Sequence, residues 1–182
     1  MGQCSSALRP LGSDPEVSRA FVNEDAGNDR PDLPELPVSP GPNFVTPRGL
    51  AALQARIARR QADLAALKAR TERLDKLPEA AAERDLRWLE ARLKAVVVID
   101  PTGHDLSEVA FGLSVTVADD EGRETAYEIV GEDEADAPRH RIAPNSPLAR
   151  ALLGAQVGDV VTWKRPSGSV DLEVIRIAHA DT

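Results

Sequence analysis

The sequence predicts an α+β protein in which an antiparallel helical hairpin precedes a small, mostly antiparallel β domain with one short helix. Two observations lead to this prediction. In the first half, apolar residues recur at spacings of three and four, as on the buried stripe of a helix. In the second half, short runs rich in Val and Ile alternate with turns that contain Gly, Pro or Asp, as in a small sheet. We therefore expect a leader over residues 1–45, a basic coiled-coil hairpin over 46–97 and a β domain over 98–182.

Composition and charge limit the function classes. The 182 residues, 42% of them apolar, suffice for a buried core, and the net charge of −8 is divided unevenly: −4 over 1–45, +5 over 46–95 and −9 over 96–182. The single cysteine, Cys4, excludes an internal disulfide and a cysteine-built zinc site. No apolar run approaches the roughly 20 residues that a membrane span needs. These features predict a cytoplasmic protein without a membrane partner.

The leader is acidic and rich in proline. Prolines recur from Pro31 to Pro42, where they remove backbone donors and bias the preceding residues toward extended conformations. We expect a disordered linker over residues 1–45 rather than a folded element.

The helical hairpin has a well-marked start, with Thr46 expected as the N-cap and Pro47 as the first helical residue. The apolar spacing then continues to Leu74, which at a rise of ~1.5 Å per residue gives a first arm of about 43 Å. After a break at Pro78 the same spacing resumes in a second arm of about 28 Å. Only a few residues separate the arms, so they are expected to fold back on each other. The expected seam consists of Leu50, Leu53, Ile57, Leu64, Leu67 and Leu74, with Leu86, Leu89, Leu93 and Val96.

The β domain is predicted from five runs, at residues 95–100, 113–119, 124–131, 159–165 and 169–178. One short helix interrupts them, with Ser146 as its N-cap, Pro147 at its first position and Gly154 at its end. Its apolar residues Leu148, Leu152 and Leu153 are expected to face the sheet.

Several motifs of the second half follow one another at characteristic spacings. They are Phe111-Gly112, "IVGEDEAD" over Ile129–Asp136, "SPLARALLG" over Ser146–Gly154 and "VGDVV" over Val157–Val161. In identity and order they resemble the carboxyl domain of the bacterial Gre family of transcription elongation factors. The segment "VTPRGL", Val45–Leu50, is similar to the helix start of that family, so the resemblance covers about residues 44–178.

The resemblance implies a carboxyl domain with a fold like that of FK506-binding proteins, docked on RNA polymerase at the rim of its secondary channel. It also implies that the hairpin enters this channel, where the nascent RNA 3′ end is a further partner. We expect a monomer that modulates the polymerase rather than catalysing alone, with no catalytic residue and no cofactor of its own. DNA binding is associated with the family, but the acidic carboxyl domain predicts no sequence-specific DNA contact.

The acidic loop after the third run is the segment that the family uses for docking. The residues that the resemblance assigns to docking are Gly131, Glu132, Asp133, Glu134, Ala135, Asp136, Ser146 and Pro147. Four carboxylates here would guide encounter with a basic or amide-rich polymerase surface. The alternative is a solvated loop kept polar for solubility.

The tip of the hairpin departs from the family. Cleaving members carry "GDLKENAEY", whose Asp and Glu help to hold the Mg²⁺ of the polymerase active centre, whereas this chain has "ERLDKLPEAAAERD". Asp75 and Glu79 are the candidate metal-holding pair, although they stand four residues apart. The alternative is ordinary solvated turn chemistry, with Glu79 favourable near a helix start.

The hairpin also carries many arginines, which would line a channel where RNA phosphates pass. They are Arg56, Arg59, Arg60, Arg70, Arg73, Arg84, Arg87 and Arg92. Plain helix surface explains them equally well, because arginine is a good helix former. Trp88 and Trp163 are expected to pack rather than to stack on bases.

Three functions therefore remain. The first is a Gre-like regulator that docks on the polymerase and affects elongation, pausing or initiation through the secondary channel, with or without cleavage of backtracked RNA. The second is a non-cleaving competitor of Gre factors, similar to Rnk, whose short hairpin does not reach the active centre. The third, a peptidyl-prolyl isomerase, rests on fold analogy alone and needs an aromatic pocket, whereas the chain has only Tyr127, Phe21, Phe44 and Phe111 besides its two tryptophans.

Overall fold

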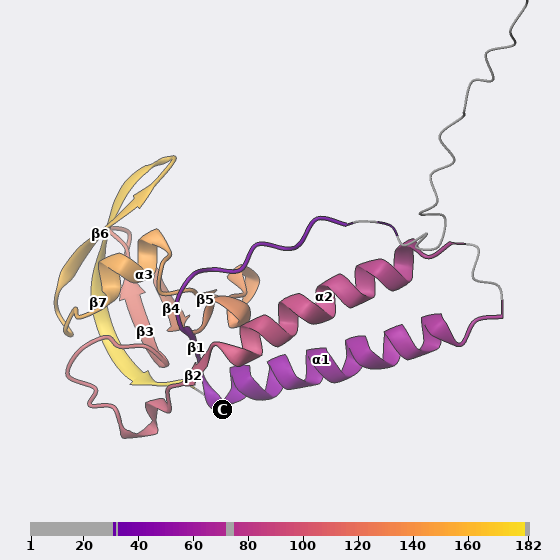
Figure 1. Cartoon of the computed structure of the whole chain (residues 1–182). Coiled ribbons are helices and arrows are strands. Elements are labelled where there is room, and N and C mark those ends of the chain that lie inside the picture. The colour runs from indigo at the N-terminus through magenta and orange to yellow at the C-terminus, as the bar shows by residue number, and fades with distance from the viewer. Residues whose placement is uncertain (1–30, 32, 72–74, 181–182) are drawn as a thin grey trace, which may run out of the picture. The chain divides into compact units, whose positions relative to one another are not determined.

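The computed structural model describes residues 31, 33–71 and 75–180 of the 182. Helix α1, Pro47–Lys68, and helix α2, Leu77–Lys94, form an antiparallel pair that is followed by a β domain, as Figure 1 shows. The predicted α+β class is confirmed. None of the helices in the described part of the chain has the length and apolar character that crossing a membrane requires.

Helix α1 begins where the sequence predicts. The Oγ1 of Thr46 accepts the Gly49 amide at 3.0 Å, and Pro47 occupies the first turn, where its missing N–H costs nothing. The helix ends at Lys68, however, and not at Leu74. The Arg70 amide reaches back three residues to the Leu67 carbonyl, at 3.4 Å, which tightens and closes the last turn. The first arm is therefore 22 residues long, about 33 Å.

Helix α2 has 18 residues and a different kind of start. Its N-cap, Lys76, has no side chain that can accept a hydrogen bond, and instead Oδ1 of Asp75 accepts the Leu77 amide at 2.9 Å. Pro78 lies in the first turn of α2, so it opens this helix rather than breaking a longer one.

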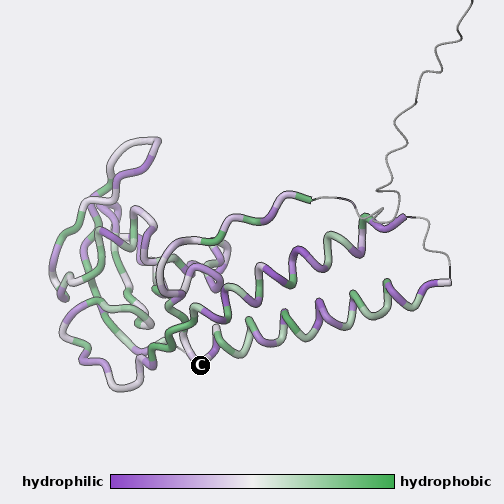
Figure 2. Tube along the Cα trace, viewed as in Figure 1, coloured by the Kyte–Doolittle hydropathy of each residue, from purple (hydrophilic) through white to green (hydrophobic). Residues whose placement is uncertain are grey.

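The predicted seam holds the two helices together. Leu53 and Ile57 of α1 are buried against Leu86 and Leu89 of α2. Partly buried residues extend this cluster, namely Leu64, Trp88, Leu93 and Val96. Figure 2 shows hydrophobic and hydrophilic residues alternating along both helices, as expected for helices with one buried stripe. Leu74 lies outside the described residues.

A short parallel ribbon closes the base of the hairpin. Strand β1, Asn43–Val45, pairs with strand β2, Val96–Val98, so that Val45 lies opposite Val98. The sequence placed the first of these segments in a disordered leader and the second in the antiparallel sheet, and both predictions are wrong for these residues. The reason is that the chain on either side of the hairpin returns to the same place, where buried Asn43 and Val45 hold β1.

The main sheet has five strands in the order β5-β4-β3-β7-β6. Their bounds are β3 Leu113–Ala118, β4 Glu124–Ile129, β5 Arg141–Ile142, β6 Val160–Arg165 and β7 Gly168–His179. All neighbours are antiparallel except β4 and β5, and β3 and β7 shift register between Thr116 and Val117. Single 3-10 turns lie at η1 Pro101–Gly103, η2 Glu132–Glu134 and η3 Ala137–Arg139.

Helix α3, Pro147–Leu152, covers the core of this sheet. Leu148 and Leu152 are buried with Val115 and Val174, and burial of such side chains contributes about 1.5–3 kcal/mol each. Leu153 was expected to join them, but it is 39% exposed. It is the C-cap residue and has left the helical conformation, so its side chain no longer follows the buried stripe.

Candidate functional site

The acidic loop that follows β4 folds as the 3-10 turn η2 and lies against β1 and α1. Gly131 opens the turn and is buried. A Cβ at Gly131 would overlap the backbone carbonyl of Phe44 and lie 2.9 Å from the Glu134 carboxylate. Only glycine at position 131 therefore lets β1 pass this closely. This close packing explains the Gly of the "IVG" motif.

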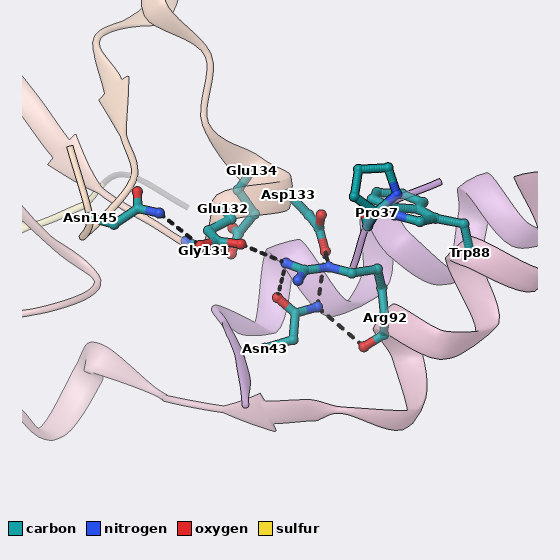
Figure 3. Close-up of polar contacts among 9 residues, drawn as sticks. All are labelled: Pro37, Asn43, Trp88, Arg92, Gly131, Glu132, Asp133, Glu134 and Asn145. Carbon is teal, nitrogen blue, oxygen red and sulfur yellow. Dashed lines mark hydrogen bonds and ion pairs between the residues drawn. The ribbon is translucent and has the colours of Figure 1, made fainter. Parts of the chain in front are cut away.

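Asp133 and Arg92 form the centre of the site, shown in Figure 3. The Arg92 side chain is only 4% exposed, and its Nε donates to Oδ2 of Asp133 at 3.0 Å. Asn43 joins them, because its Oδ1 accepts from Arg92 at 2.6 Å while its Nδ2 donates to the same Asp133 oxygen at 2.9 Å. Leader, second helix and β domain thus meet in one hydrogen-bonded cluster, which satisfies a charge that would be costly to bury alone.

Glu132 lies at the edge of this cluster. Its Oε2 accepts from Arg92 at 3.3 Å, and its Oε1 accepts from Nδ2 of Asn145 at 2.8 Å. The side chain remains 37% exposed. Glu132 is therefore shared between the buried cluster and the protein surface.

Glu134 ties η2 to the start of α1. Its two carboxylate oxygens accept from the Thr46 amide at 2.9 Å and from the Thr46 hydroxyl at 2.5 Å. The carboxyl group also fills the space above Gly49, where a Cβ would overlap it. The Thr and Gly of "VTPRGL" are thus explained by one contact, since Thr46 caps its own helix and also binds Glu134.

A second ion pair links the hairpin to the sheet. Arg48 of α1 pairs with Glu128 of β4, and Arg141 of β5 donates to the same carboxylate at 3.1 Å. Each charge of this group has an opposite charge beside it, as partly buried charges require.

The predicted docking residues therefore differ in their contacts and exposure. Asp133 and Glu134 are bound within the chain, with Asp133 only 10% exposed. Ala135 and Pro147 are exposed, while Ser146 caps α3 by accepting the Ala149 amide at 3.2 Å. Asp136 is half-buried and approaches Arg139 at 3.6 Å. The docking role of this set remains a prediction.

The arginines of the hairpin are not equivalent. Arg92 is buried, so it does not belong to a basic face. Arg60 and Arg84 both contact Asp85, at 2.5 and 3.0 Å. Arg87 pairs with Glu35 at 2.6 Å, and this hydrogen bond raises the pKa of the Arg87 guanidinium above its ordinary value.

The remaining arginines differ in their surroundings. Arg56 and Arg59 are exposed on α1 and, among the residues that the structure describes, have no carboxylate within ion-pair distance. Arg70 is exposed just beyond the end of α1, and Arg73 lies outside the described residues. The two tryptophans are each near an arginine: Arg56 lies 5.9 Å from the ring centroid of Trp88, and Arg165 lies 5.0 Å from that of Trp163.

The two acids at the hairpin tip offer few oxygens for a metal. Oδ1 of Asp75 already accepts the Leu77 amide. Glu79 lies in the first turn of α2, as the alternative expected, but it is buried rather than solvated. Within the described ranges, no cluster of three or more His, Cys, Asp or Glu residues could hold a metal ion. The magnesium-holding role of Asp75 and Glu79 remains a prediction.

Sequence reasoning missed Asn43 and Asn145, and it counted Arg92 among exposed arginines, whether of a channel face or of plain helix surface. A signal for Arg92 was present, because it lies three residues after Leu89 on the apolar stripe of α2, where a charge needs a partner. Asn43 had no such signal, since its contact with Asp133 joins distant parts of the chain.

Comparison with known proteins agrees with the motifs identified in the second half of the sequence. Residues 104–179 match the family model described as transcription elongation factor GreA/GreB, C-terminal. The chain is 42% identical over 99 residues to transcription elongation factor GreA of Thioalkalivibrio sulfidiphilus, a match that covers 53% of this chain and 63% of that protein. It is 39% identical over 98 residues to GreB of Neisseria meningitidis, covering 53% and 60% respectively.

Several solved structures are also similar. The crystal structure of GreA factor homolog 1 (Gfh1) of Thermus thermophilus aligns over 75% of this chain and 98% of its own, with 22% identity and a TM-score of 0.35. The chain spans less than two thirds of the length of the curated relatives just described. The match covers η2, α3 and all five strands of the main sheet, so residues 104–179 form a domain of the GreA/GreB carboxyl-terminal family.

Proposed function

We propose that this chain binds bacterial RNA polymerase, docking by its carboxyl-terminal domain and inserting its helical hairpin into the secondary channel. The observation that carries the proposal is the GreA/GreB match over residues 104–179, together with a hairpin fastened to that same domain by Arg92, Asp133 and Asn43. Because the hairpin is held against the carboxyl-terminal domain, docking of the domain would also orient the hairpin toward the channel.

The polarity of the hairpin supports the same function. Exposed Arg56 and Arg59 present positive charge that is not neutralised by neighbouring carboxylates in the described structure. Such charge favours a channel where RNA phosphates pass, with a contribution that falls as salt rises. We assign any hydrolysis of RNA to the polymerase rather than to this chain.

Of the two modes of action, we favour channel occupancy without stimulated cleavage. A second magnesium ion would need free carboxylate oxygens at the tip. Asp75 has one oxygen engaged by the backbone, and Glu79 is buried. The second candidate, cleavage of backtracked RNA, requires these two groups to rearrange.

The test uses backtracked elongation complexes reconstituted with bacterial RNA polymerase. Binding is measured by the fluorescence anisotropy of a labelled Gre factor with a longer hairpin, which this chain displaces from the polymerase. Cleavage is measured from the shortening of 3′-labelled RNA. Displacement without cleavage supports the favoured mode. Cleavage that is lost in Asp75→Asn, while displacement persists, supports the second candidate. Failure to displace the competitor at any concentration would overturn the docking proposal itself.

A further inference from the structure

Part of the proline-rich leader lies along α2 instead of extending away from it. We define the strap as residues 33–42, which precede β1 and are visible beside α2 in Figure 1. Oε1 of Glu35 accepts from Nη2 and Nε of Arg87 at 2.6 and 3.0 Å. The Pro37 carbonyl accepts from Nε1 of Trp88 at 2.9 Å, a contact that Figure 3 places beside the Arg92 cluster.

The strap is held much more weakly than the strand that follows it. In β1, Asn43 is 2% exposed and Val45 is fully buried, and both pair with β2. In the strap, by contrast, the Glu35 and Arg87 side chains are 61% and 55% exposed. Exposed ion pairs of this kind are screened by water and salt and contribute little. The strap can therefore leave α2 while β1 stays in place.

The junction between strap and strand suits such a movement. Gly41 has a φ of +97°, and no atom lies within 4 Å of the place where its Cβ would be. A backbone conformation that glycine adopts freely, in open space, allows the strap to swing without disturbing neighbouring side chains.

The surface under the strap has the chemistry of a phosphate-binding surface. A groove of about 610 Å³ lies between the strap and the hairpin. Its lining contains three arginines and two carboxylates, and consists of Leu36, Pro37, Arg56, Arg59, Arg60, Asp63, Asp85, Trp88 and Leu89. Guanidinium groups that flank an indole ring are suited to phosphate oxygens and stacked bases. The strap itself supplies an anionic oxygen to Arg87 and a neutral oxygen acceptor to Trp88. The phosphate and 2′-hydroxyl oxygens of an RNA backbone are acceptors of these two kinds.

We propose that the strap is an internal competitor that covers the Arg87 and Trp88 surface, so that single-stranded RNA binds there only when Glu35 and Pro37 have detached. This deepens the proposed function and rests on it, because the RNA in question would be met in the polymerase channel. Residues 33–42 lie outside the segment that matches the GreA/GreB carboxyl-terminal model.

The first experiment measures strap detachment in the isolated full-length chain. Trp163→Phe leaves Trp88 as the single tryptophan, and its emission reports whether the indole is covered. We expect Glu35→Gln and Glu35→Lys to shift this emission to longer wavelength. Glu90→Gln is the matched control, because Glu90 lies on the same helix, is exposed and forms no ion pair in the described structure. Equal emission in all variants would contradict a releasable strap.

The second experiment measures binding of a labelled single-stranded oligouridine by anisotropy, at low salt of about 50 mM. Glu35→Gln should tighten binding by roughly threefold or more, beyond the gain from Glu90→Gln, and the difference should fade as salt rises. Adding Arg87→Gln should remove the gain. If Glu35→Gln and Glu90→Gln act alike, the strap does not compete with RNA. Neither assay contains polymerase, so a failure of the docking proposal would leave these results unchanged and distinguishable.

Discussion

At the residue scale, Arg92 carries a charged guanidinium that is buried in the described structure. It is surrounded by Asp133, Asn43 and, at the edge, Glu132. A buried charge keeps its favourable balance only while these partners are present, because water cannot replace them in the closed cluster. Replacing one charged member of the cluster should therefore lower the free energy of unfolding more than replacing both members of an ion pair together.

Replacing Arg92 tests this sensitivity. Arg92→Met should lower the free energy of unfolding by about 3 kcal/mol, because Asp133 is left uncompensated. Urea denaturation measures the change, and Arg92→Met combined with Asp133→Leu should recover part of the loss. A strictly additive double variant would show that the two side chains do not interact. Arg92→Lys serves as the control that keeps the charge and loses the planar fork.

Asp119 gives the molecule a response to acid. Its carboxylate accepts the Arg123 amide at 2.9 Å and pairs with the Arg123 side chain, and these bonds lower the pKa of Asp119 below its ordinary value. A lowered folded-state pKa contributes stability above the unfolded pKa, near 3.9, and this stability is lost as pH falls through the folded pKa.

The matching variant is Asp119→Asn, which keeps the hydrogen-bond acceptor and removes the charge. We expect the melting temperature of the wild type to exceed that of Asp119→Asn at pH 6, and the gap to close as pH falls below about 4. Thermal melts across this range measure the gap. A gap that stays constant down to pH 2 would show that the Asp119 charge does not contribute.

At the element scale, the hairpin depends on a narrow seam. Leu53 is 1% exposed and packs with Ile57, Leu86 and Leu89. The other hydrophobic residues of this cluster, Leu64, Trp88, Leu93 and Val96, are only partly buried, so Leu53 and its buried partners form the centre of the cluster.

Truncation within the seam should therefore be costly. We expect Leu53→Ala to lower the free energy of unfolding by about 2–4 kcal/mol through lost burial and a residual cavity. Leu67→Ala, at a half-exposed position near the end of α1, should cost clearly less. Helix content followed by circular dichroism during urea unfolding measures both. Equal losses of unfolding free energy would mean that buried Leu53 contributes no more to stability than half-exposed Leu67.

Local features of the fold could be predicted from the sequence, and distant pairings could not. The start of α1 is encoded by adjacent residues, Thr46 and Pro47, and the seam by a short repeat. The end of α1 was missed because leucine spacing continues to Leu74 while the helix closes at Lys68 without a glycine cap. The parallel pairing of β1 with β2 has no local signal, since the register depends on how the hairpin folds back.

The candidate site follows the same division. The acidic motif was located correctly from the sequence, but its internal partners were not. Glu134 binds Thr46 and Asp133 binds Arg92, across the boundary between segments that differ in charge. Four neighbouring acids in the sequence resemble a docking surface. Only the folded chain brings together the groups that bind Glu132, Asp133 and Glu134.

At the scale of the whole molecule, hairpin and β domain are joined through separate contacts. Asp133 with Arg92, Glu134 with Thr46 and Glu128 with Arg48 each link the two. Because these contacts lie on η2 and β4, unfolding of the hairpin base removes partners from the domain, and the reverse also holds.

Coupled contacts predict coupled melting. We expect the wild type to show a single thermal transition, and in a Trp88→Phe background, where Trp163 is the single tryptophan, the helix signal and Trp163 fluorescence should change together. Arg92→Met combined with Glu134→Gln should separate the two signals, with the helix signal lost first. Glu90→Gln, on the solvent face of α2, is the control and should leave the transitions coincident. Separate transitions already present in the wild type would contradict the coupling.

The β1–β2 ribbon has a further consequence. Because Val45 and Val98 lie opposite each other, the chain leaves and re-enters the rest of the structure at one point, and everything between them is a closed excursion. Its reach is set by the number of helical turns alone, at ~1.5 Å per residue, and adding seven residues to each arm would extend it by about 10 Å while the base keeps its contacts. The length of the two helices can therefore change without a change in the β1–β2 pairing that attaches the hairpin to the rest of the structure.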